Sequence, residues 1–549
     1  MATLLSTPCV PTSFGIPSVF GLQILSVSAS MVANYNASAP AAYRFTQPST
    51  QLQSATFCNI TVSYTHPGQD DNVIVEAWLP TAENWNHRLQ AVGGGGWAAG
   101  RFFLSYRAME GALADGYATL TTDAGLGSSR DPAPWALVSP GNVDLYNLQN
   151  LGSASLNDEA RIGKQLIQSF YGKGPDYSYW NGCSQGGRQG LMLAQRYPTA
   201  YDGIAVGAPA IYWPQLFGSV IWPQQVMNML GAYPHSCEMD AITAAAVSAC
   251  DGLDGVVDGV IGSGRDVEAC LAAFDPFALV GTSVANCSSS PAAWNISHAA
   301  AAVVNATWRG AVTAEGRHIW HGLNPGADLT GASPSSNGQS GVAATNCSSN
   351  GTCVGVPNEL GLPWLNLFIN KDPSQTGFGN LTHSQFDNRV KAGLREFGSI
   401  IGTDDADLSA FQKAGGKIIS FHGLMDNVIP PKSTEEYYKA VADNTADGTQ
   451  VGDFFRHFEV PGLGHCFGGM SDPPTSLFTQ LRAWVENGTA PERSSVVLNG
   501  VGGTGENRIL CPYPRFAWFD PTCGDSAVEE CWSCCVGDSH GVKPPETEL

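Results

Sequence analysis

Apolar residues in the N-terminal part of the chain follow two different periodicities. Residues 72–79 alternate between apolar and polar side chains, as a half-buried strand does. From Ser155 to Tyr171 the apolar residues recur at helical spacing instead. Short apolar runs predict further strands at 88–92, 117–122, 179–181 and 204–206, and a further helix is predicted over 189–195. Alternating strands and helices favour a mostly parallel sheet with helices on both faces.

This alternation stops at about Tyr212 and resumes after Ser409. The segment between them is rich in Ala, Ser, Gly, Asn and Cys, which is typical of an insertion rather than of a core sheet. Strands are then predicted at 417–421 and 454–460, and a helix at 472–487. We therefore expect one catalytic domain in two parts with an inserted lid. The predicted boundaries are 1–211 and 410–510 for the catalytic domain, 212–409 for the lid domain and 511–549 for a Cys-rich tail.

The segment Gly182–Gly186 has the pattern G-x-S-x-G, with Ser184 at its centre. It lies between a predicted strand and a predicted helix. This pattern is the nucleophile elbow of α/β-hydrolases, in which a tight strand-to-helix turn exposes the serine hydroxyl. Glycines suit that turn because a side chain would collide with the neighbouring strand and helix. The sequence thus predicts an α/β-hydrolase fold with Ser184 as the nucleophile.

A serine hydroxyl needs a base to accept its proton and an acid to orient that base. Hydrolases of this fold supply the three groups in the order serine, acid, histidine. Asp426 follows the strand predicted at 417–421, and His465 follows the next one, in a Gly-rich loop. We predict Asp426 as the acid and His465 as the base. His422 is an alternative base, and Asp426 has the alternative role of capping the turn before a double proline.

Ester hydrolysis also needs hydrogen-bond donors for the oxyanion that forms on the carbonyl. The backbone N–H of Gln185, directly after the nucleophile, is one candidate. The run Gly93–Gly96 follows a predicted strand, as the Gly-rich oxyanion loop of esterases does. We predict Gly95 or Gly96 as the second donor, with a plain flexible turn as the alternative.

Charge and cysteine content bear on the partners and the compartment. The formal net charge of −21 argues against binding nucleic acid or an anionic membrane, and no apolar run has the length of a membrane span. Fifteen cysteines and nine Asn-x-Ser/Thr sequons favour an extracellular glycoprotein. The first residues lack a basic start, and Pro8 and Pro11 interrupt their apolar run, so we expect a mature or truncated N-terminus rather than a signal peptide. Oligomeric state is left open.

Two cysteines stand beside the predicted catalytic residues. Cys183 precedes Ser184, and Cys466 follows His465. A bond between them would tie the nucleophile to its base through their neighbours. With Asp426, the pairs Cys183-Ser184 and His465-Cys466 resemble the tannase and feruloyl esterase family of secreted fungal and bacterial enzymes, and the similarity extends from about Cys58 to Pro514.

The resemblance implies several properties. It supports a Cys183–Cys466 disulfide. It implies hydrolysis of plant-derived phenolic esters, in which ferulic, p-coumaric or gallic acid is joined to a sugar or alcohol, without an organic cofactor. Trp97, Trp213, Phe217 and Trp222 are candidates to stack on the phenolic ring, with core packing as the alternative. Two other functions stay open: another secreted serine hydrolase such as a lipase or carboxypeptidase-like enzyme, and a non-catalytic binding protein of hydrolase fold.

A Gly-rich acidic segment begins at Asp251. Asp251, Asp254 and Asp258 are spaced among glycines, and hard oxygen ligands on a flexible loop suit calcium. The loop is not an EF-hand, because the terminal glutamate and its spacing are missing. The resemblance implies a structural calcium site in the lid, formed by these three aspartates and the carbonyls of Val256 and Val260. An acidic surface turn is the alternative.

Overall fold

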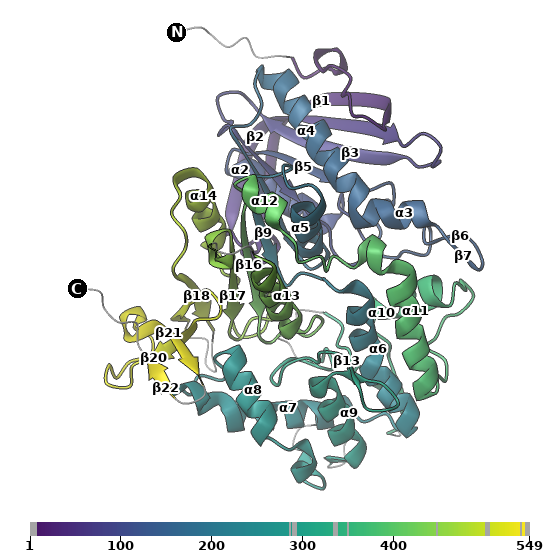
Figure 1. The fold of residues 1–549 in the computed structure, drawn as a ribbon, viewed down its shortest axis with the longest axis vertical. Coiled ribbons are helices and arrows are strands. Elements are labelled where there is room, and N and C mark those ends of the chain that lie inside the picture. The colour runs from purple at the N-terminus through teal and green to yellow at the C-terminus, as the bar shows by residue number, and fades with distance from the viewer. Residues whose placement is uncertain are drawn as a thin grey trace.

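The structure is a computed structural model of the 549-residue chain. It describes residues 8–284, 287, 294–332, 339–348, 351–445, 448, 450–499, 505–538 and 541–543. Its centre is a nine-stranded sheet in the order β1-β2-β3-β5-β4-β8-β9-β16-β17 (Figure 1). The strands are β1 (Gln23–Ala39), β2 (Thr50–Thr65), β3 (Val73–Pro80), β4 (Arg88–Val92), β5 (Ala118–Thr122), β8 (Tyr177–Cys183), β9 (Gly203–Gly207), β16 (Lys417–Gly423) and β17 (Phe455–Val460).

The strands from β5 to β17 run parallel, whereas β1, β2 and β3 pair antiparallel at one edge. The parallel strands coincide with those predicted from the apolar runs. The long β1–β2 hairpin has no counterpart in the prediction, because much of β1 is exposed on both faces and gives little hydrophobic pattern. The predicted α/β-hydrolase architecture is confirmed, with this antiparallel edge added.

Helices cover both faces of the sheet. Successive residues of one strand point to opposite faces, so Trp180 packs into one hydrophobic cluster and Tyr179 into another. The cluster that contains Trp180 includes residues of α4 (Ser155–Tyr171), α5 (Gln185–Arg196), α12 (Ser409–Lys413) and α13 (Pro431–Asn444). The opposite face is covered by α2 (Phe103–Ala114) and α14 (Leu477–Asn487). The helix predicted from residue 472 begins five residues later, after the prolines at 473 and 474.

Between β9 and β16 the chain leaves the sheet and forms a separate, mostly helical layer (Figure 1). Its main elements are α6 (Trp213–Leu230), α7 (Ser236–Cys250), α8 (Gly264–Ala273), α9 (His298–Arg309) and α11 (His383–Ile401). Three short hairpins accompany them: β10–β11 (Ser283–Val284, Trp294–Asn295), β12–β13 (Ala311–Val312, His318–Trp320) and β14–β15 (Thr345–Cys347, Cys353–Gly355). The segment has a hydrophobic cluster of its own. The domain boundaries at 212 and 409 stay a prediction.

The C-terminal region forms small sheets beside β17 (Figure 1). These are β18 (Ser494–Leu498) with β19 (Glu506–Leu510), and β20 (Phe516–Phe519) with β21 (Trp532–Asp538) and β22 (Gly541–Lys543). Disulfides Cys511–Cys534 and Cys523–Cys531 cross-link the tail, and Cys535 is a buried free thiol. Within the described ranges, no helix combines the length and apolar character that crossing a bilayer requires.

Candidate active site

Ser184 sits in the sharp turn between β8 and α5. Its φ of 61° is unusual for a residue with a side chain, and its N–H donates to the Gly207 carbonyl at 2.9 Å. The glycines on either side allow this turn. A Cβ at Gly182 would lie 2.6 Å from the Gly186 carbonyl carbon, and one at Gly186 would lie 3.0 Å from the Gly94 oxygen. The turn therefore has the geometry expected of a nucleophile elbow.

Ser184, His465 and Asp426 form one hydrogen-bonded chain. Ser184 Oγ lies 2.9 Å from His465 Nε2, and His465 Nδ1 lies 2.8 Å from Asp426 Oδ2. The hydroxyl donates to Nε2 if Nδ1–H donates to the carboxylate, which is the tautomer that a general base requires. Each residue follows a parallel strand (β8, β16 and β17), so all three meet at the carboxyl edge of the sheet.

Asp426 is fully buried, and four donors surround its carboxylate. Oδ1 accepts the backbone N–H groups of Val428 and Ile429, both at 2.8 Å. Oδ2 accepts from His465 and, at 3.1 Å, from His422 Nε2. Burial by itself raises the pKa of Asp426, but the charge of His465 and the hydrogen bonds from both histidines outweigh it, so the pKa is lowered from its ordinary value. Asp426 is therefore held as a carboxylate.

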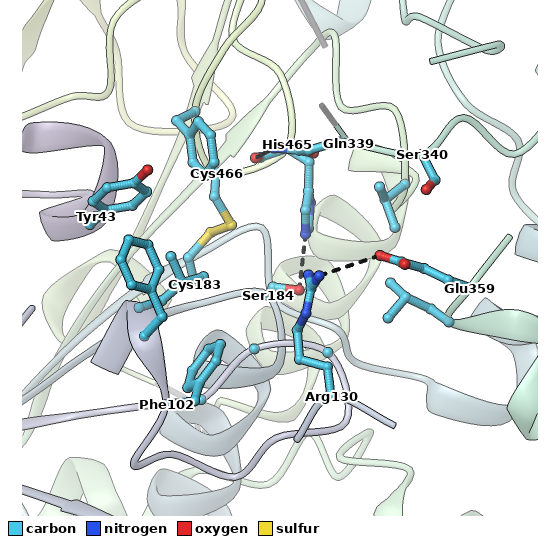
Figure 2. A pocket seen from close by; sticks show the side chains of 18 of the residues that line it. Tyr43, Phe102, Arg130, Cys183, Ser184, Gln339, Ser340, Glu359, His465 and Cys466 are labelled. Atoms are coloured by element: carbon cyan, nitrogen blue, oxygen red, sulfur yellow. Dashed lines mark hydrogen bonds and ion pairs between the residues drawn. A yellow bond between two sulfur atoms is a disulfide. The ribbon is translucent and has the colours of Figure 1, made fainter. Parts of the chain in front are cut away.

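The structure contains the Cys183–Cys466 disulfide that the family resemblance implied, with an S–S distance of 2.03 Å (Figure 2). It joins the end of β8 to the loop that carries His465. Cys466 has a φ of 63°, in the left-handed region, as Ser184 does. The disulfide therefore connects the turn that holds Ser184 to the loop that holds His465.

The candidate oxyanion donors differ in what they already bind. Gly94 N–H donates to Gln189 Oε1 at 2.8 Å, and Gly95 N–H donates to the Ala98 carbonyl at 3.1 Å. In the described part of the chain, the N–H groups of Gly96 and Gln185 have no such partner. Both residues line the space beside Ser184. Of the two glycines predicted, the geometry favours Gly96.

A cavity of about 380 Å³ opens over Ser184, within the size range of ligand sites (Figure 2). One side is aromatic, and the other is formed by the inserted segment, which contributes Gln339, Asn358, Glu359 and Leu360. Arg130 and Glu359 both line the cavity and form an ion pair, with 3.8 Å between Nη2 and Oε1. The aromatic wall consists of Tyr43, Phe45, Phe102, Phe103 and Phe467. Sequence reasoning missed this wall, because its residues are far apart in the chain and carry no motif.

The four predicted aromatic residues have different positions. Trp213 and Phe217 line a narrow apolar slot of about 20 Å³ that also reaches Ser184, Gln185 and Gly96. Trp97 is fully buried and stacks on Phe217, with 5.5 Å between ring centroids. Trp222 packs against Phe386 and lines neither cavity. The core-packing alternative therefore describes Trp97 and Trp222.

The acidic loop follows α7 in the insertion and comprises the turn Asp251–Asp254 and the residues after it. Asp251 Oδ1 accepts the N–H groups of Asp258 and Gly259, each at 3.0 Å, and Asp258 Oδ2 accepts from Arg508 at 2.9 Å. The carboxylate oxygens of the three aspartates do not all lie within 4.8 Å of one another. Among the described residues, His235, Cys237 and Cys287 form the one His/Cys/Asp/Glu cluster that does, and its cysteines are joined in a disulfide.

Arg188 has a role that the elbow motif alone did not reveal. It is fully buried, and its guanidinium donates to Gln185 Oε1 at 2.7 Å and to the carbonyls of Leu151 and Gly152. Burial lowers its pKa to about 9, which leaves it charged at neutral pH. Arg188 thus links Gln185, which lines the space beside Ser184, to the helix turn at Asn150–Ala154.

The fold and this site together define an enzyme of the α/β-hydrolase class. Residues 58–534 match the family model described as tannase and feruloyl esterase, and the chain belongs to that family. It is a carboxylic ester hydrolase of the feruloyl esterase and tannase type, as the motifs around Ser184 and His465 predicted.

Individual relatives agree with this assignment. A probable feruloyl esterase of Arthroderma benhamiae is 37% identical over 93% of this chain and 91% of its own length. A tannase of Aspergillus oryzae is 28% identical over 88% of this chain and 86% of its own. The solved tannin acyl hydrolase of Aspergillus niger superposes with a TM-score of 0.83 at 26% identity, covering 96% of this chain and 95% of its own.

Proposed function

We propose that the protein hydrolyses esters of hydroxyaryl acids through an acyl-enzyme formed on Ser184. The observation that carries this proposal is the continuous chain from Ser184 through His465 to Asp426, which opens into a cavity with an aromatic wall. Family membership supplies the substrate class, phenolic esters. The feruloyl, p-coumaroyl and galloyl groups all belong to this class.

In the first step Ser184 Oγ attacks the ester carbonyl while His465 Nε2 takes its proton. The N–H groups of Gln185 and Gly96 stabilise the oxyanion, and Asp426 stabilises the imidazolium. His465 then gives the proton to the departing alcohol oxygen, leaving the aryl acid esterified to Ser184. Water, deprotonated by His465, attacks this ester and releases the free acid.

A substrate panel tests the proposed class. Methyl ferulate, methyl gallate, a triglyceride and a peptide substrate are compared by kcat/KM, with the Ser184→Ala variant as the background. We expect turnover of at least one of the two aryl esters and kcat/KM at least ~100-fold lower for the triglyceride and the peptide, equivalent to about 2.7 kcal/mol of transition-state discrimination. Preferred hydrolysis of the triglyceride or the peptide would overturn the proposal.

We also propose that the loop from Asp251 to Val260 holds a structural calcium ion. The donor set fits this ion, because it offers carboxylate and carbonyl oxygens on a turn bent by Gly255 and Gly259, whose φ values are 91° and 90°. Asp251 would remain bound to the loop backbone, and calcium would compete with Arg508 for Asp258. The ion would fix the conformation of the loop itself, between α7 and α8 of the inserted segment.

Thermal unfolding tests this loop. Calcium added after treatment with a chelator should raise the Tm by at least about 2 °C, because a ligand that binds only the folded state stabilises it. The effect should disappear in Asp254→Asn and persist in a control at an exposed acid, Asp176→Asn. An equal response to calcium in Asp254→Asn and in the wild type would contradict the site.

We also propose that the protein is secreted and glycosylated. The seven disulfides among the described residues favour an oxidising compartment outside the cell. Two of the nine sequons, Asn286 and Asn350, lie outside the described residues. Those with exposed asparagines, and so the best candidates for glycans, are Asn36, Asn295, Asn346, Asn380 and Asn487. Mass spectrometry of protein secreted from a fungal host, before and after deglycosylation, measures their occupancy.

A further inference from the structure

His422 contacts the triad without contacting the nucleophile. It lies near the end of β16, four residues before Asp426, and its side chain is fully buried. Nε2 is 3.1 Å from Asp426 Oδ2, the same oxygen that binds His465, and 3.1 Å from the Ile429 carbonyl oxygen. The possibility that His422 is the base is therefore wrong, because His465 occupies that place beside Ser184. Its function has to act through Asp426.

The hydrogen bonds assign one tautomer to His422. Nε2 faces two acceptors, a carboxylate oxygen and a carbonyl oxygen, so it carries the proton. Nδ1 of the neutral ring is then an acceptor, and it lies 2.8 Å from the hydroxyl of Thr434 on α13, which is also fully buried. The Thr434 hydroxyl thus donates to Nδ1 and fixes Nε2–H toward Asp426.

We propose that His422 is a positioning residue for the triad acid. This inference rests on the proposed function of Ser184, His465 and Asp426. By donating to Oδ2, His422 fixes the rotation of the carboxylate and shares the negative charge that faces His465. The carboxylate then orients the neutral His465 ring without favouring a second proton on its Nε2 before substrate binds. Activity on the acidic side of the pH profile therefore depends on this donor.

Loss of this donor has two consequences with the same sign. Oδ2 would lose one of its hydrogen bonds in a buried site. The ionised form of Asp426 would then be less stable relative to the protonated form at low pH. The charge on Oδ2 that remains would be directed at His465 alone, which favours the imidazolium before substrate arrives. Both consequences move the acidic limb of the kcat/KM profile to higher pH, because that limb reports protonation of the free enzyme.

Other charged or titratable groups in this region could also affect the pH profile, so their contributions have to be separated from that of His422. Burial and the neighbouring His422 lower the pKa of His457 to about 3, so His457 stays neutral. Burial raises the pKa of Glu459 to about 7, which makes Glu459→Gln a necessary control. Glu435 and Lys432 on α13 lie beside Glu459, whereas Arg130 and Glu359 line the cavity over Ser184.

A matched pair of variants isolates the donor. In His422→Gln the side-chain amide places an N–H near the position of Nε2, whereas in His422→Asn the shorter amide reaches only as far as Nδ1. We expect kcat/KM at neutral pH to fall about 10- to 100-fold in His422→Asn, the range for losing a hydrogen bond to a charged group, and about threefold or less in His422→Gln. The acidic limb should move to higher pH in His422→Asn and stay in place in His422→Gln and Glu459→Gln.

The pH dependence of fluorophosphonate labelling at Ser184 gives a second readout, since it needs the base but no particular ester. Equal acidic limbs in His422→Asn, His422→Gln and the wild type would overturn the inference, even if His422→Asn unfolds at a lower temperature. Absence of labelling in the wild-type protein would instead contradict the proposed function. The two failures are therefore distinguishable.

Thr434 provides a test if His422→Asn does not fold. Thr434→Val keeps the shape of the side chain but removes the hydroxyl that fixes the tautomer, whereas Thr434→Ser retains the hydroxyl. The acidic limb should move in the same direction in Thr434→Val as in His422→Asn, by a smaller amount, and should stay in place in Thr434→Ser. A wild-type limb in Thr434→Val would overturn the role assigned to the tautomer.

Discussion

Gly96 illustrates how much of the chemistry depends on single backbone groups. Gly96 lines the space beside Ser184, and its N–H has no partner among the described residues, whereas the N–H of its neighbour Gly95 donates to the Ala98 carbonyl. Its φ is 58°, and a Cβ there would lie 3.2 Å from Leu360 Cδ2, the end of a flexible side chain. A methyl group at this position can therefore be accommodated by the fold and still displace the donor.

We expect Gly96→Ala to lower kcat by at least ~10-fold. Removing one oxyanion donor lowers kcat about 100- to 1000-fold, and this substitution only displaces the donor N–H. Steady-state kinetics with methyl ferulate or methyl gallate measures the change. Gly127→Ala is the control, since Gly127 also has a positive φ but open space around it. The two variants should lose similar stability, about 1 kcal/mol for alanine in this region. Equal kcat in both variants would exclude Gly96 as a donor.

The three residues that form the hydrogen-bonded chain could be singled out from sequence because each carries local constraints. Ser184 needs flanking glycines, and His465 and Asp426 follow recognisable strands in a fixed order. The sequence could not decide between Gly95 and Gly96 as the donor, because the answer depends on which of the two N–H groups forms a hydrogen bond within the turn. His422 was ambiguous for a similar reason: only its contact with Asp426 separates a positioning role from that of the base.

At the scale of elements, the Cys183–Cys466 disulfide joins two loops that the parallel sheet already brings together. It closes a separation of 283 residues, which in the chain-entropy description contributes on the order of 5 kcal/mol at most. The sheet and both helical layers also hold these loops. The local effect on the distance between Ser184 and His465 should therefore exceed the effect on folding.

The double variant Cys183→Ala/Cys466→Ala tests this expectation. We predict that kcat falls at least ~10-fold, since misplacement by about 1 Å costs that much or more, while the protein still unfolds cooperatively. Cys9→Ala/Cys58→Ala is the matched control, because that disulfide lies at the distant antiparallel edge of the sheet. Stability should fall in both double variants, but kcat only in the first. Full activity without Cys183–Cys466 would count against a positioning role.

The core elements were predictable because parallel strands are buried on both faces and read as short apolar runs. The predicted helix at 155–171 has the same bounds in the structure. The insertion was recognised by its composition, but its helices and hairpins were not, because they pack on one another without a repeating pattern. The aromatic wall of the cavity assembles from three distant segments, at 43–45, 102–103 and 467, which no local pattern connects.

At the scale of the whole molecule, one buried acid influences stability without serving the site. Glu159 on α4 is fully buried, and neither carboxylate oxygen has a hydrogen-bond partner in the described structure. Burial raises its pKa well above the ordinary value of 4.5. The folded protein therefore retains a proton that the unfolded chain releases above that value. The contribution of Glu159 to the free energy of unfolding is therefore most favourable at low pH and becomes less favourable as the pH rises.

We predict that Glu159→Gln makes the free energy of unfolding less dependent on pH between pH 5 and pH 8. In the wild type this group can contribute a decline of up to about 1.4 kcal/mol per pH unit, until the pKa of the folded state is reached. The variant should thus be more stable than the wild type at pH 8 and not at pH 5. Denaturant unfolding at several pH values measures this, with the exposed Glu83→Gln as control. Parallel pH dependence in wild type and Glu159→Gln would contradict it.

The central claim is that Ser184 forms a covalent acyl-enzyme with the help of His465 and Asp426. Its most direct measurement is mass spectrometry of the protein quenched during turnover of an activated feruloyl or galloyl ester. We expect one acyl group per chain, located on the peptide that contains Ser184, and none in Ser184→Ala, which should remain folded. An acyl group on another residue, or continued turnover in folded Ser184→Ala, would contradict it.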